Sequence, residues 1–413
     1  MTSIYVIEVE GHIIDSLTLP KIMDTILDMG ASYNIEDIKI GNKKEESSYA
    51  RLCISAEDDE IMSKILEKVT KQGATLLKEE NVTLGESVKD QTMPDAFYST
   101  TNLKTDILLD GEWIAVGDTA MDCGIVVNTE NKTAKCLKLS QIKKGDKIVL
   151  GYMGVRVHPL KKHEDKQVFS FMGSEVSSEK PKSLVIKKIA KRMIEMKKNN
   201  EGKILFVLGP AVVHTKSREA FSKLIELGYV DYMFAGNALA THDIEAALYG
   251  TSLGVSLEDG TPITGGHSHH LRAINKVNQC GSIRNAVESG IVSNGIMHTC
   301  IKNNVDFVLA GSIRDDGPLP EVIRNSVEAQ CEMKKRINKD VQMTIMVASM
   351  LHSIAVGNLL PAYVETICVD INPAVVTKLA DRGSFQTIGL VTDIEAFMRD
   401  LAECISEETK NNA

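Results

Sequence analysis

The sequence lacks several patterns that would place it in a common class. Its eight cysteines include no C-x-x-C pair and follow no secretory signal, so we expect a protein of the reducing cytoplasm. The formal net charge is -9, and Lys and Arg occur only in short runs that suit solvated helix faces. Because phosphate binding needs basic side chains clustered on one surface, we predict no nucleic-acid partner.

Two nucleotide-binding fingerprints and a membrane span are also missing. No G-x-G-x-x-G follows a predicted strand, and no G-x-x-x-x-G-K-[ST] occurs. Residues 343–364 contain no Asp, Glu, Lys or Arg, but Ser349, His352, Asn358 and Pro361 interrupt the run. This segment predicts a buried strand, a polar turn and a short buried helix, so we expect no membrane association.

The chain has 413 residues, which exceeds what one hydrophobic core usually organises, and its patterning divides it into three predicted domains. Residues 1–85 follow the β-α-β-β-α-β order of a ferredoxin-like α+β domain, most often a regulatory or oligomerising module. The expected elements are residues 4–11, 17–29, 33–41, 48–55, 61–69 and 74–77. Residues 86–175 contain short strand-like runs between Asp-Gly, Asn and Gly-Asp turns, which predict a β-rich domain, a small barrel or sheet.

Residues 176–413 predict an α/β domain with a mostly parallel sheet, which follows a boundary at residues 174–182. Short apolar runs without alternation suit strands that are buried on both faces. They cover residues 203–208, 230–235, 305–310, 344–348, 366–369 and 387–391. Each run ends in a polar loop, and open α/β sheets assemble their sites at these carboxyl ends.

Three loops carry most of the candidate chemistry: residues 234–245, 265–272 and 310–318. The histidines at 267, 269 and 270 lack an accompanying Cys pair or H-E-x-x-H, so we predict proton transfer or carboxylate binding and no metal. Asp315 and Asp316 offer one carboxylate for proton abstraction and another for an amine or ribose; the alternative is a solvated turn.

Other polar residues have two interpretations each. We expect His242 and Asp243 to be capping or core partners, and Cys280 to be a buried structural thiol, since nothing beside it marks an activated nucleophile. Asp370 ends a predicted strand, where an acid can bind both hydroxyls of an NAD ribose. The alternative for Asp370 is an ordinary helix cap, and Asp393 has the same two interpretations.

Long segments in a fixed order carry a resemblance that covers nearly the whole chain. They are residues 97–102, 174–179, 209–214, 235–238, 265–275, 308–320, 350–361 and 369–373. With these segments the chain resembles the archaeal alternative ornithine cyclodeaminases. It is also similar to the C-terminal module of cyanobacterial arginine dihydrolases, in a family that has been labelled lysine-oxoglutarate reductase/saccharopine dehydrogenase.

The resemblance implies an enzyme that converts L-ornithine to L-proline and ammonia, with tightly held NAD that is reduced and reoxidised within one turnover. It places the protein in proline biosynthesis and in arginine and ornithine metabolism. It also implies an NAD-binding domain of the deoxyhypusine-synthase type, which would account for the missing glycine fingerprint. The residues implied to line the cofactor are Asn237, Ala238, Asp316, Ser349, Met350, Leu351, His352, Asp370, Asn372, Thr392 and Asp393.

The implied reaction needs acids near the substrate amines and a cation near its carboxylate. By residue type we expect Asp315 to accept the proton of the α-ammonium, so that the α-hydrogen can leave as hydride. Arg272 or Arg314 is the candidate clamp for the carboxylate. His269 or His270 is the candidate proton shuttle.

Two rival functions use the same loops. A saccharopine- or lysine-type amino-acid dehydrogenase would release reduced NAD, and an NAD-binding sensor would bind amino acids without catalysis. Ornithine and lysine differ by one methylene, and the depth of the substrate pocket decides which of the two is preferred. We also expect a homo-oligomer, a dimer or tetramer. Because no amidinotransferase-like domain lies upstream, we do not expect the chain to consume arginine.

Overall fold

The structure is a computed structural model that describes residues 3–14, 16–43, 46–77, 80–158, 182–215, 217–263, 265–381 and 387–411. The chain forms two compact units. The first is Met1–Gln167 with Asn358–Tyr363, and the second is Val168–Gly357 with Val364–Ala413. Of the boundary predicted at residues 174–182, only Lys182 lies within the described residues.

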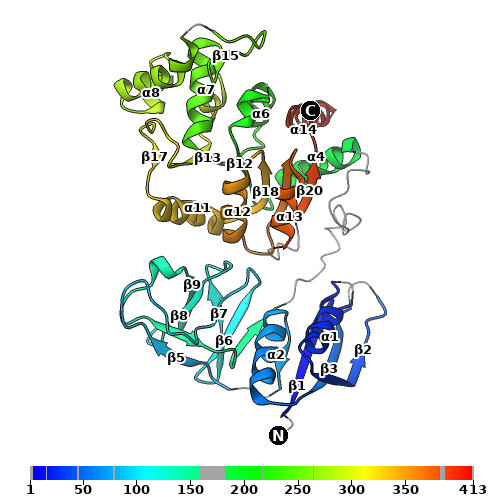
Figure 1. The fold of residues 1–413 in the computed structure, drawn as a ribbon. Coiled ribbons are helices and arrows are strands. Elements are labelled where there is room, and N and C mark those ends of the chain that lie inside the picture. The colour runs from blue at the N-terminus through cyan, green and yellow to red at the C-terminus, as the bar shows by residue number, and fades with distance from the viewer. Residues whose placement is uncertain are drawn as a thin grey trace. The chain divides into compact units, whose positions relative to one another are not determined.

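The amino-terminal part of the first unit is an antiparallel sheet of order β2-β3-β1-β4 with two helices (Figure 1). Its elements are β1 (Ser3–Gly11), α1 (Thr18–Asp28), β2 (Ser32–Lys39), β3 (Ser48–Ala56), α2 (Asp59–Lys71) and β4 (Thr75–Leu76). Alternation along β3 buries Ala50, Leu52 and Ile54 in one core with the apolar faces of α1 and α2. The predicted ferredoxin-like order is confirmed.

The rest of the first unit is a seven-stranded sheet of order β11-β6-β7-β9-β8-β10-β5. Its strands are β5 (Thr83–Glu86), β6 (Thr105–Leu109), β7 (Glu112–Gly117), β8 (Gly124–Asn128), β9 (Thr133–Leu137), β10 (Lys147–Leu150) and β11 (Val155–Val157). All described pairs are antiparallel except β7 with β9. The predicted β-rich region is therefore confirmed as a sheet, and β5 crosses the predicted domain boundary at residue 85.

The second unit contains a parallel seven-stranded sheet of order β17-β16-β13-β12-β18-β19-β20. Its strands are β12 (Lys203–Leu208), β13 (Tyr232–Gly236), β16 (Asp306–Ala310), β17 (Val322–Ile323), β18 (Val341–Val347), β19 (Glu365–Asp370) and β20 (Thr387–Val391). Every neighbouring pair is parallel, as the sequence predicted. The two-residue strand β17 was not predicted.

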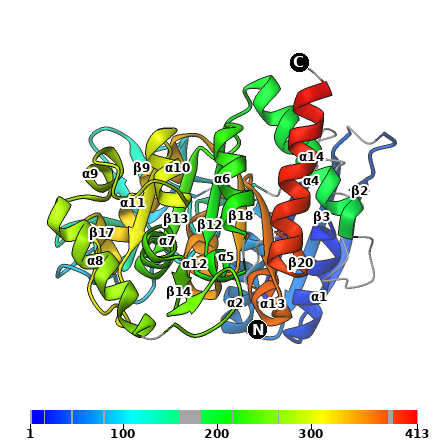
Figure 2. The same ribbon diagram turned by 90° about the horizontal axis from the view of Figure 1, so that it is seen from above.

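Helices cover both faces of this sheet. They are α4 (Lys182–Asn199), α5 (Ala211–His214), α6 (Arg218–Glu226), α7 (Asn237–Tyr249), α8 (His269–Cys280), α9 (Ile283–Glu288), α10 (Ile296–Lys302), α11 (Ser326–Asp340), α12 (Met350–Leu359), α13 (Pro373–Asp381) and α14 (Ile394–Asn411). The helices α4, α6 and α14 pack together, with α14 beside α4 in Figure 2, while α11 and α13 lie on the opposite face of the sheet (Figure 1). A short hairpin, β14 (Thr251–Ser252) and β15 (Val255–Ser256), follows α7.

The apolar segment at residues 343–364 forms the buried strand β18 and the helix α12, as predicted. None of the described helices is long and apolar enough to cross a bilayer. Cys280 corrects a smaller prediction, because it ends α8 half-exposed instead of buried.

Candidate functional site

The sheet of the second unit has a topological switch point between β12 and β18. From β12 the chain continues to β13, β16 and β17 on one side, and β18, β19 and β20 lie on the other. The loops after β12 and β18 come very close there, since a Cβ atom on Gly209 would lie 1.7 Å from the carbonyl oxygen of Ala348. In open α/β sheets, ligands bind in the crevice at this position.

One half of the carboxyl edge carries the predicted acid Asp370. It is 9 % exposed at the end of β19, and one carboxylate oxygen accepts the N–H of Asn372 at 2.8 Å. Asn372 in turn accepts the N–H of Ala374 at the start of α13. The N–H of Thr392 donates to the carbonyl of Asp370 at 3.2 Å, which joins the loops after β19 and β20.

Asp393 is a helix cap. Its carboxylate accepts the N–H of Ala396 at 2.9 Å, and its carbonyl accepts the N–H of Phe397. This geometry is the helix-cap alternative stated for Asp393 from the sequence.

The loop from β18 into α12 points one imidazole inward. Leu351 is 79 % exposed and Met350 is 37 % exposed, and Ser349 is half-buried. The Cε1 atom of His352 lies only 3.1 Å from the position of a Cβ atom on Gly236. Burial lowers the pKa of His352, and the charge of Asp315 partly opposes this shift.

Asn237 holds the loop after β16 in place. Its Nδ2 donates to the carbonyl of Gly317 at 3.3 Å, and its Oδ1 accepts the N–H of Leu319 at 3.1 Å. The residue is 3 % exposed at the start of α7, and its neighbour Ala238 is half-buried. The side chain of Asn237 thus positions the loop that carries Asp315 and Asp316.

The two adjacent acids differ in their contacts. The carboxylate of Asp315 accepts the N–H of Ser312 at 2.8 Å, which closes a turn. The carboxylate of Asp316 is 67 % exposed and lies 3.2 Å from Nε2 of His270. The side chains of Arg272 and Arg314 are exposed, and within the described ranges no carboxylate pairs with either guanidinium.

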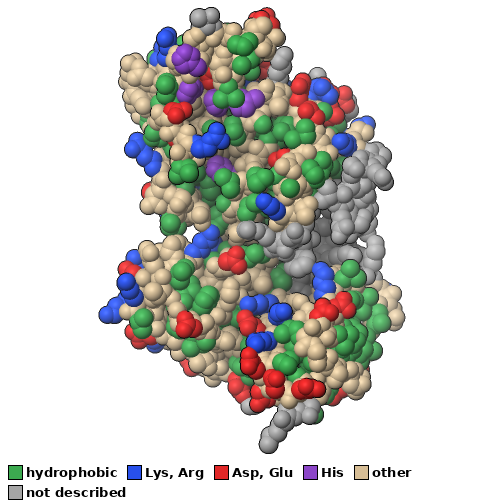
Figure 3. Space-filling view, viewed as in Figure 1, with side chains coloured by type: hydrophobic (Ala, Val, Ile, Leu, Met, Phe, Trp, Pro, Cys, Tyr) green, Lys and Arg blue, Asp and Glu red, His purple; other side chains and the backbone are tan. Residues whose placement is uncertain are grey.

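Imidazoles gather over the carboxyl ends of β12 and β13. The rings of His214 and His242 are 5.0 Å apart between centroids, and those of His242 and His270 are 6.4 Å apart. His269 stacks on Tyr249 at 4.8 Å. We call His214, His242, His269 and His270 the histidine cluster; histidine side chains are purple in Figure 3 and gather on one face of the second unit.

A buried carboxylate, Glu245, organises this cluster. Its side chain is 0 % exposed, and it accepts hydrogen bonds from His242 Nδ1 and Thr251 Oγ1, both at 2.9 Å. The amides of Leu253 and Gly254 donate to it at 3.3 and 3.1 Å. Burial alone would raise the pKa of Glu245, but the hydrogen bonds outweigh burial and lower the pKa. Glu245 is therefore ionised at neutral pH.

These bonds determine which ring nitrogens carry protons. An ionised carboxylate only accepts, so His242 donates from Nδ1 to Glu245. The Thr251 hydroxyl uses its one hydrogen on Glu245 and therefore accepts from Nδ1 of His269 at 2.9 Å. Neither ring has a hydrogen-bond partner for its Nε2 among the described residues. Neutral His242 and His269 both present Nε2 as a proton acceptor.

The neighbouring residues His242 and Asp243 have different roles. Asp243 is 0 % exposed, pairs with Arg218, and accepts the amides of Ile296 and Met297 at 2.9 and 2.8 Å at the start of α10. The prediction of a core and capping partner is confirmed for Asp243. His242 instead bonds to Glu245 and lies beside His214, so it belongs to the histidine cluster.

The histidine cluster is not arranged around a metal. No group of three or more His, Cys, Asp or Glu side chains in the described parts of the chain has metal-binding geometry. Nδ1 of His214 forms a hydrogen bond with Oγ of Ser252 at 2.6 Å. Burial lowers the pKa of His214, and the neighbouring His242 lowers it further. Such closely spaced imidazoles suit proton transfer.

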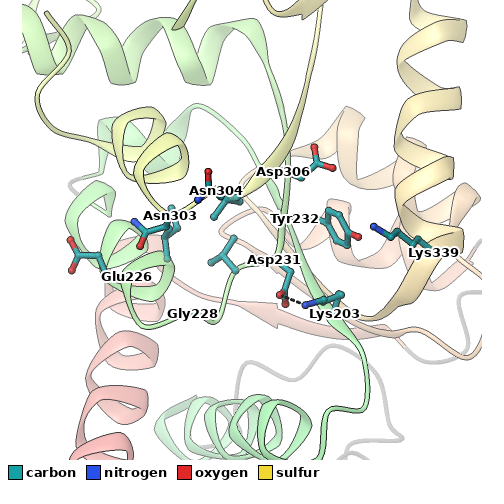
Figure 4. Close-up of a pocket in the computed structure, with 12 residues that line it drawn as sticks. Lys203, Glu226, Gly228, Asp231, Tyr232, Asn303, Asn304, Asp306 and Lys339 are labelled. Carbon is teal, nitrogen blue, oxygen red and sulfur yellow. Dashed lines mark hydrogen bonds and ion pairs between the residues drawn. The ribbon is translucent and has the colours of Figure 1, made fainter. Parts of the chain in front are cut away.

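A cavity of about 380 Å³ lies at the opposite edge of the sheet (Figure 4). Its lining includes Lys203, Tyr232 and Asp306, which begin β12, β13 and β16. Figure 4 shows Lys203 paired with Asp231, at 3.1 Å. The cavity is therefore at the amino ends of the strands, away from the switch point, and we do not assign the reaction to it.

Family models match almost the full length. Residues 4–103 match the conserved region of the LOR/SDH bifunctional enzyme, residues 104–186 the first region of the C-terminal part of ArgZ-like arginine dihydrolases, and residues 187–401 the Rossmann-fold region of that part. An ornithine cyclodeaminase of Methanothermobacter thermautotrophicus is 53 % identical over 393 residues, 95 % of each chain. This chain belongs to the ornithine cyclodeaminase family. The resemblance stated from the sequence is thereby confirmed.

Solved structures of the family agree with this assignment. ArgZ, an arginine dihydrolase of the cyanobacterial ornithine-ammonia cycle, matches with a TM-score of 0.84 and 36 % identity over 99 % of this chain and 59 % of its own. AgrE, in a ternary complex with ornithine and NAD+, matches with a TM-score of 0.54 and 38 % identity over 99 % of this chain and 58 % of its own. The more specific likeness to deoxyhypusine synthases remains a prediction.

Sequence reasoning missed two parts of this site, Glu245 and His214. The spacing of His242 and Glu245, three positions apart on a helix, places both on one face and was a usable signal. For His214, no local pattern distinguishes a site histidine from a surface one.

Proposed function

We propose that this protein is an NAD-dependent ornithine cyclodeaminase that forms L-proline and ammonia from L-ornithine. The observation that carries the proposal is the composition of one sheet edge. An acid suited to ribose, Asp370, lies on one side of the switch point, and paired acids and imidazoles suited to amines lie on the other. Membership of the cyclodeaminase family over the whole chain supports the same reaction.

The described residues fit NAD. The carboxylate of Asp370 uses one described hydrogen bond, to Asn372, and a carboxylate can accept several, so it can also take ribose hydroxyls. The start of α12, with Ser349 to His352, adjoins the switch point, where backbone N–H groups suit a pyrophosphate. When bound, NAD takes up a hydride from the substrate and returns it. The further contacts that we propose are Asn237, Ala238, Asp316, Asn372, Thr392 and Asp393.

The protein's own residues supply the proton transfers. We propose that Asp315 accepts the proton of the α-ammonium, since its charge acts on the half-buried His352 at the same sheet edge. Arg272 or Arg314 binds the substrate carboxylate, because both guanidiniums are exposed and unpaired among the described residues. His269 fits the role of shuttle, since its Nδ1 is engaged by Thr251; His270 is engaged by Asp316 instead.

The wider biology is also part of the proposal. None of the eight cysteines, all of which are among the described residues, is in a disulfide, which suits a reducing cytoplasm. Formation of proline from ornithine places the protein in proline biosynthesis and in arginine and ornithine metabolism. The ferredoxin-like part is of a kind that often joins subunits, so we propose a homo-oligomer.

The test incubates the purified protein with L-ornithine and no added cofactor. Proline and ammonia should form in equal amounts while no reduced nicotinamide accumulates. Accumulation that depends on added NAD would instead indicate an amino-acid dehydrogenase, and bound NAD without product would indicate a sensor. Asp315→Asn should lower turnover by about 10²-fold or more if this carboxylate is the base; full turnover would remove Asp315 from that role.

A further inference from the structure

The Glu245 and His242 pair is a second acid–base couple that the roles above leave unused. Both side chains lie on one face of α7, three positions apart, and are 0 % and 12 % exposed. A buried carboxylate is costly unless it is fully hydrogen-bonded. Here His242, Thr251 and two backbone amides satisfy it, so the hairpin after α7 is folded around a permanent negative charge.

Glycine permits this arrangement. Gly254 has a φ of 74°, and a Cβ atom there would lie 2.6 Å from the carbonyl carbon of Gly266. Gly254 therefore packs directly against the loop before α8 while its N–H donates to Glu245. The geometry of the pair depends on tertiary contacts and is held by them.

The groups around His242 distinguish this ring from its neighbours. His214 from α5 and His270 from α8 face it, at 5.0 and 6.4 Å between ring centroids, and Glu245 is on its own helix. Of the three rings, only His242 hydrogen-bonds a buried carboxylate. His242 is therefore the one of these three rings whose tautomer a buried carboxylate fixes.

The proposed reaction has two amines to deprotonate, and the site has two carboxylates near an imidazole: Asp315, whose charge acts on His352, and Glu245, which accepts a hydrogen bond from His242. Asp315 lies near His352, which contacts Gly236 just before α7. His242 is six positions further along the helix, about 9 Å of helical rise. The start of α7, beside His352, and the turn that carries His242 are thus separate places along the helix, as the two amines of one diamine are separate along its carbon chain.

Resting on the proposed cyclodeaminase function, we infer that His242 is the acid–base catalyst of ring closure and that Glu245 is its positioning residue. Nε2 of His242 removes a proton from the δ-ammonium, and the freed lone pair forms the new bond to the α-carbon of the iminium. Two protons in total pass from the δ-nitrogen through His242 to the α-nitrogen. The first prepares the α-nitrogen to leave, and loss of the second frees a lone pair on the δ-nitrogen that forms the C=N bond of the cyclic iminium. The bond from the α-carbon to the α-nitrogen breaks with its electron pair on nitrogen, the released ammonia takes up the second proton, and His242 ends in its starting protonation state.

Glu245→Gln is the decisive variant. The glutamine amide places an N–H₂ group against two of the four donors that bond to the Glu245 carboxylate in the wild-type protein. We expect kcat to fall by about 10²-fold or more, with KM and bound NAD little changed. The acidic limb of the kcat profile should move to lower pH, since loss of the carboxylate disfavours imidazolium. Glu258→Gln, an exposed acid nearby, is the matched control and should behave as wild type.

A spectroscopic measurement tests the geometry without turnover. In ¹⁵N-histidine-labelled protein free of ornithine, the His242 signal, assigned with His242→Asn, should report the tautomer with hydrogen on Nδ1. If Glu245→Gln does not fold, this spectrum and the activity of His242→Asn decide the matter. Hydrogen on Nε2 of His242, or wild-type turnover by His242→Asn, would overturn the inference. Wild-type protein that forms no proline would refute the proposed function itself.

Discussion

Replacement of Arg192 by methionine should destabilise the second unit strongly. Arg192, in α4, donates to both carboxylate oxygens of Glu365 at the start of β19, with Nη2 at 2.8 Å and Nε at 3.1 and 3.2 Å. The two side chains are 10 % and 6 % exposed. Glu201, which is 33 % exposed, pairs with the same guanidinium at 2.6 Å.

The size of the effect follows from what Arg192→Met leaves behind. Methionine retains most of the apolar volume, so the main cost is a buried Glu365 carboxylate without its cation. Removal of one partner of a buried pair costs about 3 to 5 kcal/mol, and Glu201 adds little because water reaches it. The double variant Arg192→Met with Glu365→Leu removes the orphaned charge and should recover most of this loss.

Urea unfolding followed by far-UV circular dichroism measures these free energies. The only tryptophan, Trp113, is in the first unit, so its fluorescence reports separately on that unit. A loss below about 1 kcal/mol for Arg192→Met would refute the reasoning. A double variant no more stable than the single one would show that the unpaired carboxylate is not the cause.

Three further predictions concern the sheet edge. Gly209→Ala should abolish NAD binding or destabilise the fold by about 1 to 3 kcal/mol or more, because the added Cβ would overlap the carbonyl of Ala348. Gly117→Ala is the control in urea unfolding, since the nearest atom to a Cβ added there is 3.6 Å away. Asp370→Ala should weaken NAD binding by about 10- to 100-fold in titration calorimetry, and an unchanged affinity would exclude the ribose contact. Burial lowers the pKa of His352, so the folded protein binds fewer protons than the unfolded one and loses stability as pH falls through about 6.5; His352→Gln should reduce that loss in thermal unfolding between pH 7 and 5.

The strands and their order of appearance followed from local patterns. Runs such as residues 203–208 and 387–391 are apolar without alternation of apolar and polar residues. Because such runs are typical of strands that are buried on both faces, a helix-covered parallel sheet was predictable. The polar residues at the strand ends, including Asp370 and Asp315, were predictable for the same reason. The sequence around Asp370 and the sequence around Asp393 each place an acid between a strand and a helix. Packing alone showed that Asp393 caps its helix, whereas Asp370 accepts the N–H of Asn372.

The sequence by itself determined the three large sheets and the family, and it predicted the carboxyl edge of the parallel sheet as the candidate site. Tertiary structure alone decided that Glu245 is buried and that it fixes the tautomers of His242 and His269. The physical reason is that hydrophobic periodicity follows from the order of the residues alone, whereas the ionisation and orientation of a side chain depend on the donors that folding brings to it. Thr251 and the amides of Leu253 and Gly254 reach Glu245 through the hairpin after α7, and His269 at the start of α8 reaches Thr251.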